Sequence, residues 1–71
     1  AEMHAEATGL IELDELLTRL GEVEPGAARV FECRYFAGLS EQETADALGI
    51  SLRTAQREWH QARQWLAQHM A

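Results

Sequence analysis

The sequence predicts an all-helical (all-α) domain of four helices that contains a helix-turn-helix and no β-strand. Three observations support this fold class. Apolar residues recur at helical spacing along most of the 71-residue chain. No segment shows the strict alternation of apolar and polar residues that marks a half-buried strand. The stretches between the helical segments are short, so consecutive helices should pack as neighbours.

The first helix is predicted from about Gly9 to Leu20, with Gly21 just past its end. Residues 1–8 lack helical periodicity, and we expect them to be frayed or disordered. The four-helix domain is therefore expected over residues 9–70. The helix carries a stripe of leucines at helical spacing, made of Leu10, Leu13, Leu16, Leu17 and Leu20.

The second helix is predicted to begin near Pro25, because proline is favoured in the first turn of a helix. We expect it to end near Ala37, just before Gly38. One face of this helix is apolar and should pack into the core. Its members are Ala27, Val30, Phe31, Cys33 and Ala37.

Two expectations about packing follow from these stripes. Arg34 lies within the apolar stripe of the second helix, and a buried arginine needs an acidic partner. We therefore expect an ion pair between Arg34 and either Glu43 or Asp46. We also expect deep burial of five large residues, namely Val30, Phe31, Leu48, Trp59 and Leu66.

A capping box begins the third helix, which is predicted over residues 41–48. In this motif the Ser40 side chain bonds a backbone N–H of the first turn, and the Glu43 side chain reaches back to the cap residue. Gly49 suits the left-handed position of a tight turn, and Ser51 can cap the next helix. These residues predict two helices joined by a short turn.

The longest helix is predicted over residues 52–69 and completes a helix-turn-helix at about residues 40–69. In this motif the second helix normally lies in the major groove of DNA. Its apolar face holds Leu52, Ala55, Trp59, Ala62 and Leu66. The opposite face carries no acid, since Glu58 lies nearer the buried edge. That outer row consists of Arg53, Arg57, His60 and Gln64.

We expect six residues at the start of this last helix to contact DNA. Arginine forks pair with phosphate and guanine, while glutamine and histidine can reach base edges or phosphates. Hydroxyl groups beside the free N–H groups of a first helical turn favour a phosphate. The six are Ser51, Arg53, Thr54, Gln56, Arg57 and His60.

The net charge of −6 argues against a nucleic-acid partner until its distribution is considered. Residues 1–24 carry a net charge of −6, and residues 25–71 carry a net charge of zero. All six basic residues are arginine, and from Ser51 onward the net charge is +2. The domain can therefore offer a modestly basic face to phosphate, while its acidic end repels DNA.

The sequence shows no pattern of a catalytic, metal or membrane-spanning site. One cysteine allows no internal disulfide, and His4, His60 and His69 lack metal-ligand spacing. No apolar run approaches the ~20 residues of a membrane span. No carboxylate pair, glycine-rich phosphate loop or catalytic triad is evident. We therefore expect a cytoplasmic domain with no enzymatic activity, no cofactor and no bound metal.

Four segments carry a resemblance to a known family. They are R-Y-F-A-G-L-S at 34–40, E-T-A-D-A-L-G-I-S at 43–51, A-R-Q-W-L at 62–66 and L-D-E-L-L-T-R-L at 13–20. Together they resemble region 4, the C-terminal domain of bacterial sigma-70 family RNA polymerase sigma factors, in the extracytoplasmic-function (ECF) group. The resemblance covers about residues 9–70.

The resemblance implies a sigma region 4 fold, which is winged-helix-like but has no strands. It implies recognition of the −35 promoter element through the last helix, so that RNA polymerase is directed to initiate transcription. The partners implied are double-stranded promoter DNA, the β-subunit flap of the RNA polymerase core and an anti-sigma factor, with the domain itself a monomer. The domain that melts the −10 element is not among these residues, so we expect a piece of a longer protein.

Three residues depart from the family pattern. Thr44 and Ala55 stand where such domains usually carry a larger aliphatic residue and a valine, which implies a lighter core. Gln56 stands where a basic residue is common, which implies weaker attraction to phosphate. The turn and its caps match the pattern.

Two other functions stay open from the sequence. The first is a response-regulator-type helix-turn-helix regulator, which is also four-helical but usually dimerises through its last helix. The second is a protein-interaction module that binds polymerase or an anti-sigma factor without DNA contact, with the acidic first helix meeting a basic partner. A dimer in solution would favour the first, and absence of DNA binding at low salt would favour the second.

Overall fold

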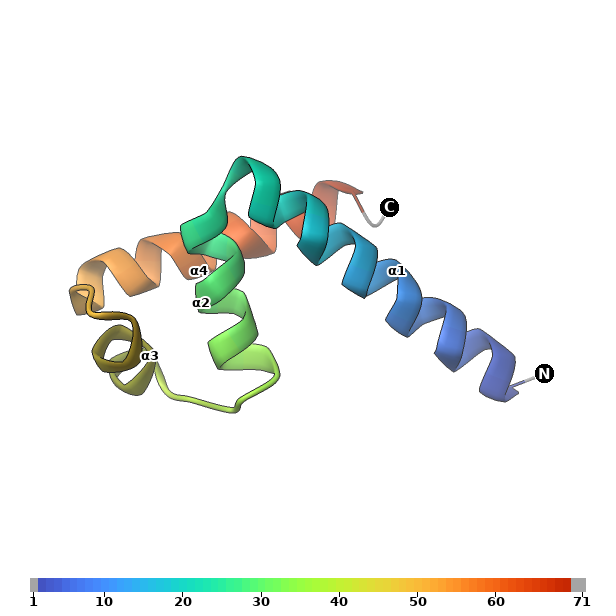
Figure 1. Ribbon diagram of the computed structural model, residues 1–71, viewed down its shortest axis with the longest axis horizontal. Helices are drawn as coiled ribbons and strands as arrows, with labels where there is room; N and C mark the ends of the chain where they lie inside the picture. Colours follow the sequence, from blue (N-terminus) through green and yellow to red (C-terminus); the bar gives the residue numbers. More distant parts are fainter. Residues whose placement is uncertain (1, 70–71) are drawn as a thin grey trace.

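The computed structural model describes the backbone of residues 2–69 and the side chains of residues 12–69. The described chain is all-helical and contains no strand, which confirms the predicted fold class (Figure 1). α2 packs against both α1 and α4, and α3 packs against α4 and α2. The helices are α1 (Glu2–Val23), α2 (Pro25–Tyr35), α3 (Glu41–Leu48) and α4 (Leu52–His69).

The third and fourth helices have the predicted bounds, whereas the first is longer at both ends. α1 begins at Glu2 instead of near Gly9, over a segment rich in the good helix formers alanine and glutamate. It also continues through Gly21, because the backbone N–H of Glu24 still donates to the Leu20 carbonyl. The fraying of residues 1–8 stays a prediction.

Gly21 therefore lies inside α1 and not just past its end, as the sequence suggested. A Cβ at Gly21 would lie 3.8 Å from the Cβ of Ala28, so small residues face each other where α1 meets α2. The second helix, in contrast, ends at Tyr35 before the predicted Ala37. The chain then reverses at Gly38, whose φ of 70° is a left-handed conformation that favours glycine.

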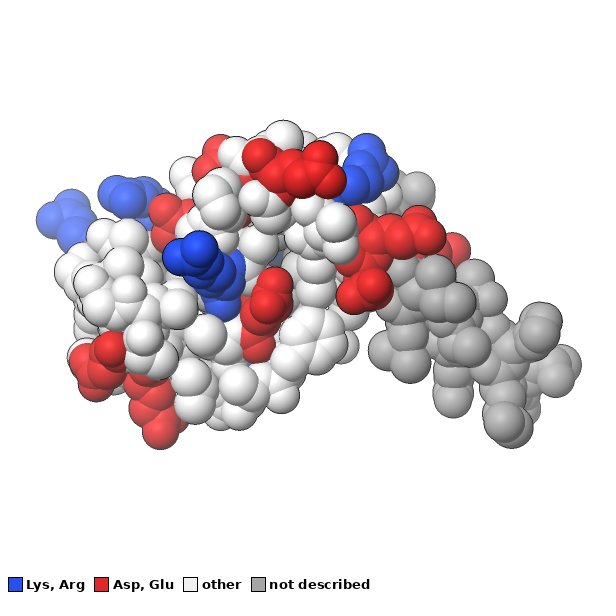
Figure 2. Space-filling model, viewed as in Figure 1, with Lys and Arg blue, Asp and Glu red and all other residues white. Residues whose placement is uncertain are grey.

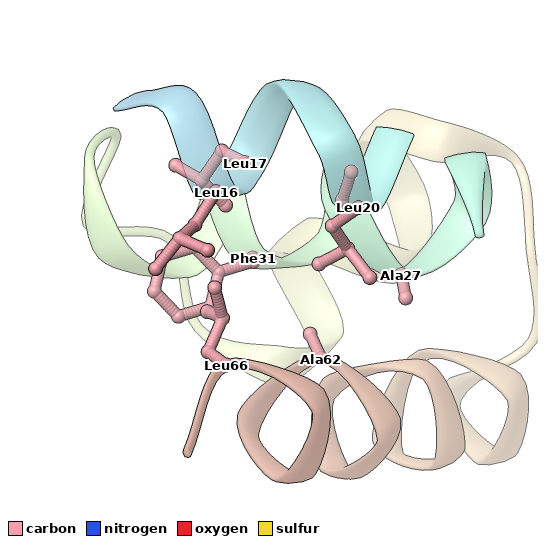
Figure 3. Packing of buried hydrophobic residues seen from close by; sticks show 8 residues of the cluster. Leu16, Leu17, Leu20, Ala27, Phe31, Ala62 and Leu66 are labelled. Carbon is pink, nitrogen blue, oxygen red and sulfur yellow. The ribbon is translucent and has the colours of Figure 1, made fainter. Parts of the chain in front are cut away.

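The main core lies where α1, α2 and α4 meet (Figure 3). Leucines of α1 point toward the aromatic ring of α2 and the small residues of α4. Val30 and the small residues Ala45 and Ala55 are buried as well, where α3 joins α2 and α4. The labelled members of the main core are Leu16, Leu17, Leu20, Ala27, Phe31, Ala62 and Leu66.

Of the five residues predicted to be deeply buried, Val30, Phe31 and Leu66 are confirmed and the other two are wrong. Leu48 is half-buried because it ends the short helix α3. Leu52, placed on the apolar face by helical spacing, is 39% exposed because it is the first residue of α4.

Trp59 is also only half-buried, since it forms the edge of the core. One side of its indole stacks on Phe31, with ring centroids 5.4 Å apart. The guanidinium carbons of Arg34 and Arg63 lie 5.1 and 5.8 Å from the indole centroid. Two cations therefore flank a ring that the sequence predicted to be deeply buried.

The predicted ion pair of Arg34 is wrong as well. Arg34 Nη1 instead donates to the Leu39 carbonyl at 3.1 Å, and so fastens the loop that leads into α3. Its two expected partners are otherwise engaged, Glu43 with the backbone of Ser40 and Asp46 with the side chain of Gln42. The Leu39 carbonyl thus accepts one hydrogen bond from the guanidinium, while Arg34 Nε is buried without a hydrogen-bond partner.

Candidate nucleic-acid interface

The turn between α3 and α4 is held by the predicted local hydrogen bonds. The backbone N–H of Ser40 donates to Glu43 Oε1 at 2.8 Å, and the N–H of Glu43 donates to Ser40 Oγ at 3.1 Å. The backbone hydrogen bond from Ser40, followed by that of its hydroxyl, lowers the pKa of Glu43. At the other end Gly49 has φ 66°, in the left-handed region expected for it.

Ser51 caps the start of α4, as its position in the sequence indicated. Its Oγ accepts from the backbone N–H of Thr54 at 3.1 Å, and its hydroxyl donates to Thr54 Oγ1 at 2.9 Å. Both hydroxyls are therefore used within the cap. Their contribution to a phosphate site would come through the first-turn backbone N–H groups that the cap holds in place.

α4 presents its polar face outward and its small apolar residues inward. Among the predicted contact residues, the side chains of four are exposed along this helix, while Thr54 is half-buried beneath the cap. Ala55, Ala62 and Leu66 are buried on the opposite side. The four exposed residues, Arg53, Gln56, Arg57 and His60, share one accessible face with Gln64.

Charge is unevenly distributed along the molecule. Figure 2 shows arginine side chains projecting at the end where α4 begins, and acidic side chains gathered over the described part of α1. A second acidic group lies over α3, whose first turn carries Glu41 and Glu43. The outward face of α4 is therefore the part of the helix-turn-helix that offers positive charge to a polyanion.

A shallow pocket lies between the start of α3 and the start of α4. Sequence reasoning assigned Arg34 to an internal ion pair, but the structure places it in this pocket beside Gln56 and the capped turn. The pocket is lined by Arg34, Ser40, Glu41, Gln42, Leu52 and Gln56.

A second, more apolar groove lies on another side of the domain, between α1, α2 and α4. Two exposed aromatic residues stand at or near it, Tyr35 at 61% and Phe36 at 58% exposed. Their rings pack edge to face, with centroids 5.2 Å apart. Sequence reasoning missed this surface, which is lined by Leu13, Phe31, Tyr35, Arg63, Leu66 and Ala67.

Other kinds of site are not found in the part of the chain that the structure describes. No group of three or more histidine, cysteine, aspartate or glutamate side chains there could hold a metal ion. Over the same residues, no helix combines the length and apolar character that a membrane span requires.

A capped helix-turn-helix with an outward polar helix and an apolar groove defines a helical domain of the DNA-binding class. The family comparison is more specific: the chain matches the ECF sigma factor family over residues 2–71, and it belongs to that family. ECF sigma factors are alternative sigma factors, a non-enzymatic family that acts with RNA polymerase and promoter DNA in transcription initiation. No curated protein and no solved structure matched the chain.

Proposed function

We propose that this domain recognises the −35 element of a promoter by placing α4 in the major groove. The observation that carries the proposal is the row of exposed side chains on the outward face of α4, directly behind a turn whose caps are fully formed. Guanidinium, amide and imidazole groups are suited to base edges and phosphates. The residues proposed to contact DNA are Ser51, Arg53, Thr54, Gln56, Arg57 and His60.

The charge distribution indicates that the isolated domain binds DNA only weakly. Residues 25–71 have no net charge, and residues 1–24 carry −6, which repels the phosphate backbone. Only a few arginines near α4 can release counterions from DNA. Promoter recognition by this domain therefore depends on RNA polymerase to hold it at the DNA, and the domain acts as a monomer in the cytoplasm.

We further propose that polymerase contacts the apolar groove between α1, α2 and α4. Exposed aromatic residues such as Tyr35 and Phe36 are enriched where one protein binds another. The groove opens on a different part of α4 from Arg53 and Arg57, so one domain can hold DNA and protein together. The β-subunit flap is the proposed occupant, and an anti-sigma factor would compete for it or for α4.

The same groove supports a second candidate function. If the acidic charge outweighs the arginines of α4, the domain binds only proteins and never touches DNA. Measurement on duplex DNA at low salt separates the two functions, because an electrostatic interface of even a few contacts is strongest there.

The experiment that tests contact of α4 with DNA is a salt titration of binding to a fluorescently labelled, mixed-sequence DNA duplex. We expect the Arg53→Ala/Arg57→Ala variant to bind more weakly than the wild type at low salt, with a salt slope that is shallower by about two units. Arg19→Ala/Arg29→Ala is the charge control, since it also removes two positive charges and both arginines are exposed on other helices. Equal binding by the wild type and the double variant at every salt concentration would contradict the proposal.

A further inference from the structure

The first turn of α2 begins with Pro25, a favoured first residue, but it lacks a side-chain cap and an acidic residue. Its N-cap residue Glu24 makes no side-chain cap hydrogen bond, and the first turn contains no acidic residue. The first N–H groups of any α-helix have no partner within the helix, and they carry a partial positive charge. The start of α2 is therefore favourable for a negative group supplied from elsewhere.

The carboxylate of Glu58, from α4, lies beside this helix start. A Cβ at Gly26, the second residue of α2, would lie 3.3 Å from Glu58 Oε2, 3.4 Å from Cδ and 3.5 Å from Oε1. The Oε2 atom is buried and accepts no hydrogen bond. The carboxylate thus lies directly against the first turn of α2, where a side chain at position 26 would crowd Oε2.

The inward side chains of the first half of α4 explain why this contact matters. Ala55 is buried but small, and Leu52 is exposed. Thr54 is bonded back to Ser51 within the cap. Glu58 and Trp59 are thus the large side chains that this part of α4 directs toward α2. Small contacts alone let a helix roll about its axis, because they interdigitate little.

We propose that Glu58 is a positioning residue, whose carboxylate against Gly26 fixes the rotation of α4 so that its arginines face outward. The inference rests on the proposed function of α4 and adds to it. It also explains how an acidic residue is tolerated in a helix that reads DNA. Held at the start of α2, the charge of Glu58 points away from the face that carries Arg53 and Arg57.

The test compares Glu58→Ala with Glu58→Gln, which remove the same charge. Glutamine keeps the length and an acceptor oxygen, so Glu58→Gln should bind the mixed-sequence duplex at least as tightly as the wild type. Glu58→Ala should bind about three- to tenfold more weakly than Glu58→Gln, as expected when contacts of a rotated helix are weakened. Equal dissociation constants for the two variants, both folded by circular dichroism, would overturn the proposal.

A second measurement does not depend on DNA. In the Glu58→Ala background, Gly26→Ala should raise the melting temperature by a few degrees, because alanine is a better helix former than glycine. With Glu58 present the same substitution should raise it less or lower it, since the new methyl group displaces the carboxylate. If Gly26→Ala changes the melting temperature by the same amount in both backgrounds, Glu58 does not contact Gly26 and the proposal fails.

The amide resonances of α4 separate failure of this inference from failure of the proposed function. Glu58→Ala should shift the amides of Arg53 and Gln64, which lie on the outward face several residues from position 58, more than Glu58→Gln does in the free protein. If the wild type binds no DNA while these shifts and the melting-temperature coupling are seen, the proposed function fails and the positioning role stands. Absence of both effects refutes the positioning role whatever the DNA result.

Discussion

The first two helices of this domain, α1 and α2, are stabilised differently from the last two, α3 and α4. α3 and α4 begin with capping side chains, and every hydrogen bond that shapes their turn comes from residues close in sequence. α2 begins without a side-chain cap of its own, and its first turn lies against Glu58 of α4. The helix-turn-helix is therefore specified locally, whereas its orientation on the rest of the domain depends on residues far apart in the chain.

The largest effect is expected in the core that joins the two pairs. Leu20 is fully buried between α1 and the other helices, and replacing a buried leucine by alanine costs ~2–5 kcal/mol. A domain this small has little stability to lose, so Leu20→Ala should be largely unfolded at room temperature. Chemical denaturation checks this expectation. Val23→Ala, at an exposed position on the same helix, should leave the unfolding free energy nearly unchanged.

The next prediction compares the two kinds of helix start directly. Ser40→Ala removes a formed capping box and should lower the unfolding free energy by about 1 kcal/mol. Glu24→Ala, at a cap position that makes no side-chain hydrogen bond, should change it far less. Thermal melts of the two variants are sufficient. Similar losses in both would mean that α2 also depends on its local cap.

A gain of similar size is expected on the buried face of α3. Thr44 is fully buried, and its Oγ1 has no hydrogen-bond partner. Thr44→Val keeps the shape and removes the unsatisfied hydroxyl, so the domain should become more stable by about 1 kcal/mol. Thr18→Val is the matched control, because the Thr18 hydroxyl is exposed and already donates to the Asp14 carbonyl. A loss of stability in Thr44→Val would show that the hydroxyl has a partner in solution.

The smallest effect is a pH dependence at the capping box. The hydrogen bonds from Ser40 hold the pKa of Glu43 below its ordinary value of 4.5 in the folded domain. A depressed folded-state pKa gives stability that is present above the unfolded-state value and is lost as the pH falls through the folded-state value. Between pH 6 and acid, the wild type should therefore lose slightly more stability than Glu43→Gln. If the melting temperatures of the wild type and Glu43→Gln fall by the same amount as the pH is lowered, the hydrogen bonds of the capping box are not the origin of the lowered pKa.

The sequence predicted the helix-turn-helix well, because its ends are encoded by single residues. Ser40, Gly49 and Ser51 each have a local conformational role, and α3 and α4 have the predicted bounds. The predicted end of α1 was wrong, because Gly21 was interpreted as the residue that follows a helix. The close packing of Gly21 against Ala28 explains better why a glycine stands there. Such tertiary causes leave no local pattern in the sequence.

The candidate site was predictable to the same extent. The exposed row on α4 follows from helical periodicity, so the side chains of Arg53, Arg57 and His60 could be placed on one face. The partner of Arg34 could not be predicted, because it is a loop carbonyl whose position depends on how the chain reverses at Gly38. The apolar groove could not be predicted either, because it forms only where three helices meet.

The most direct test of the central claim is an amide-shift titration of the labelled domain with duplex DNA at low salt. If α4 reads DNA, the largest changes should fall on Arg53, Arg57, His60 and the capped turn at Ser51. The groove residues around Tyr35 should change little. Changes confined to the groove, or to the acidic helix α1, with none on the outward face of α4, would contradict the claim.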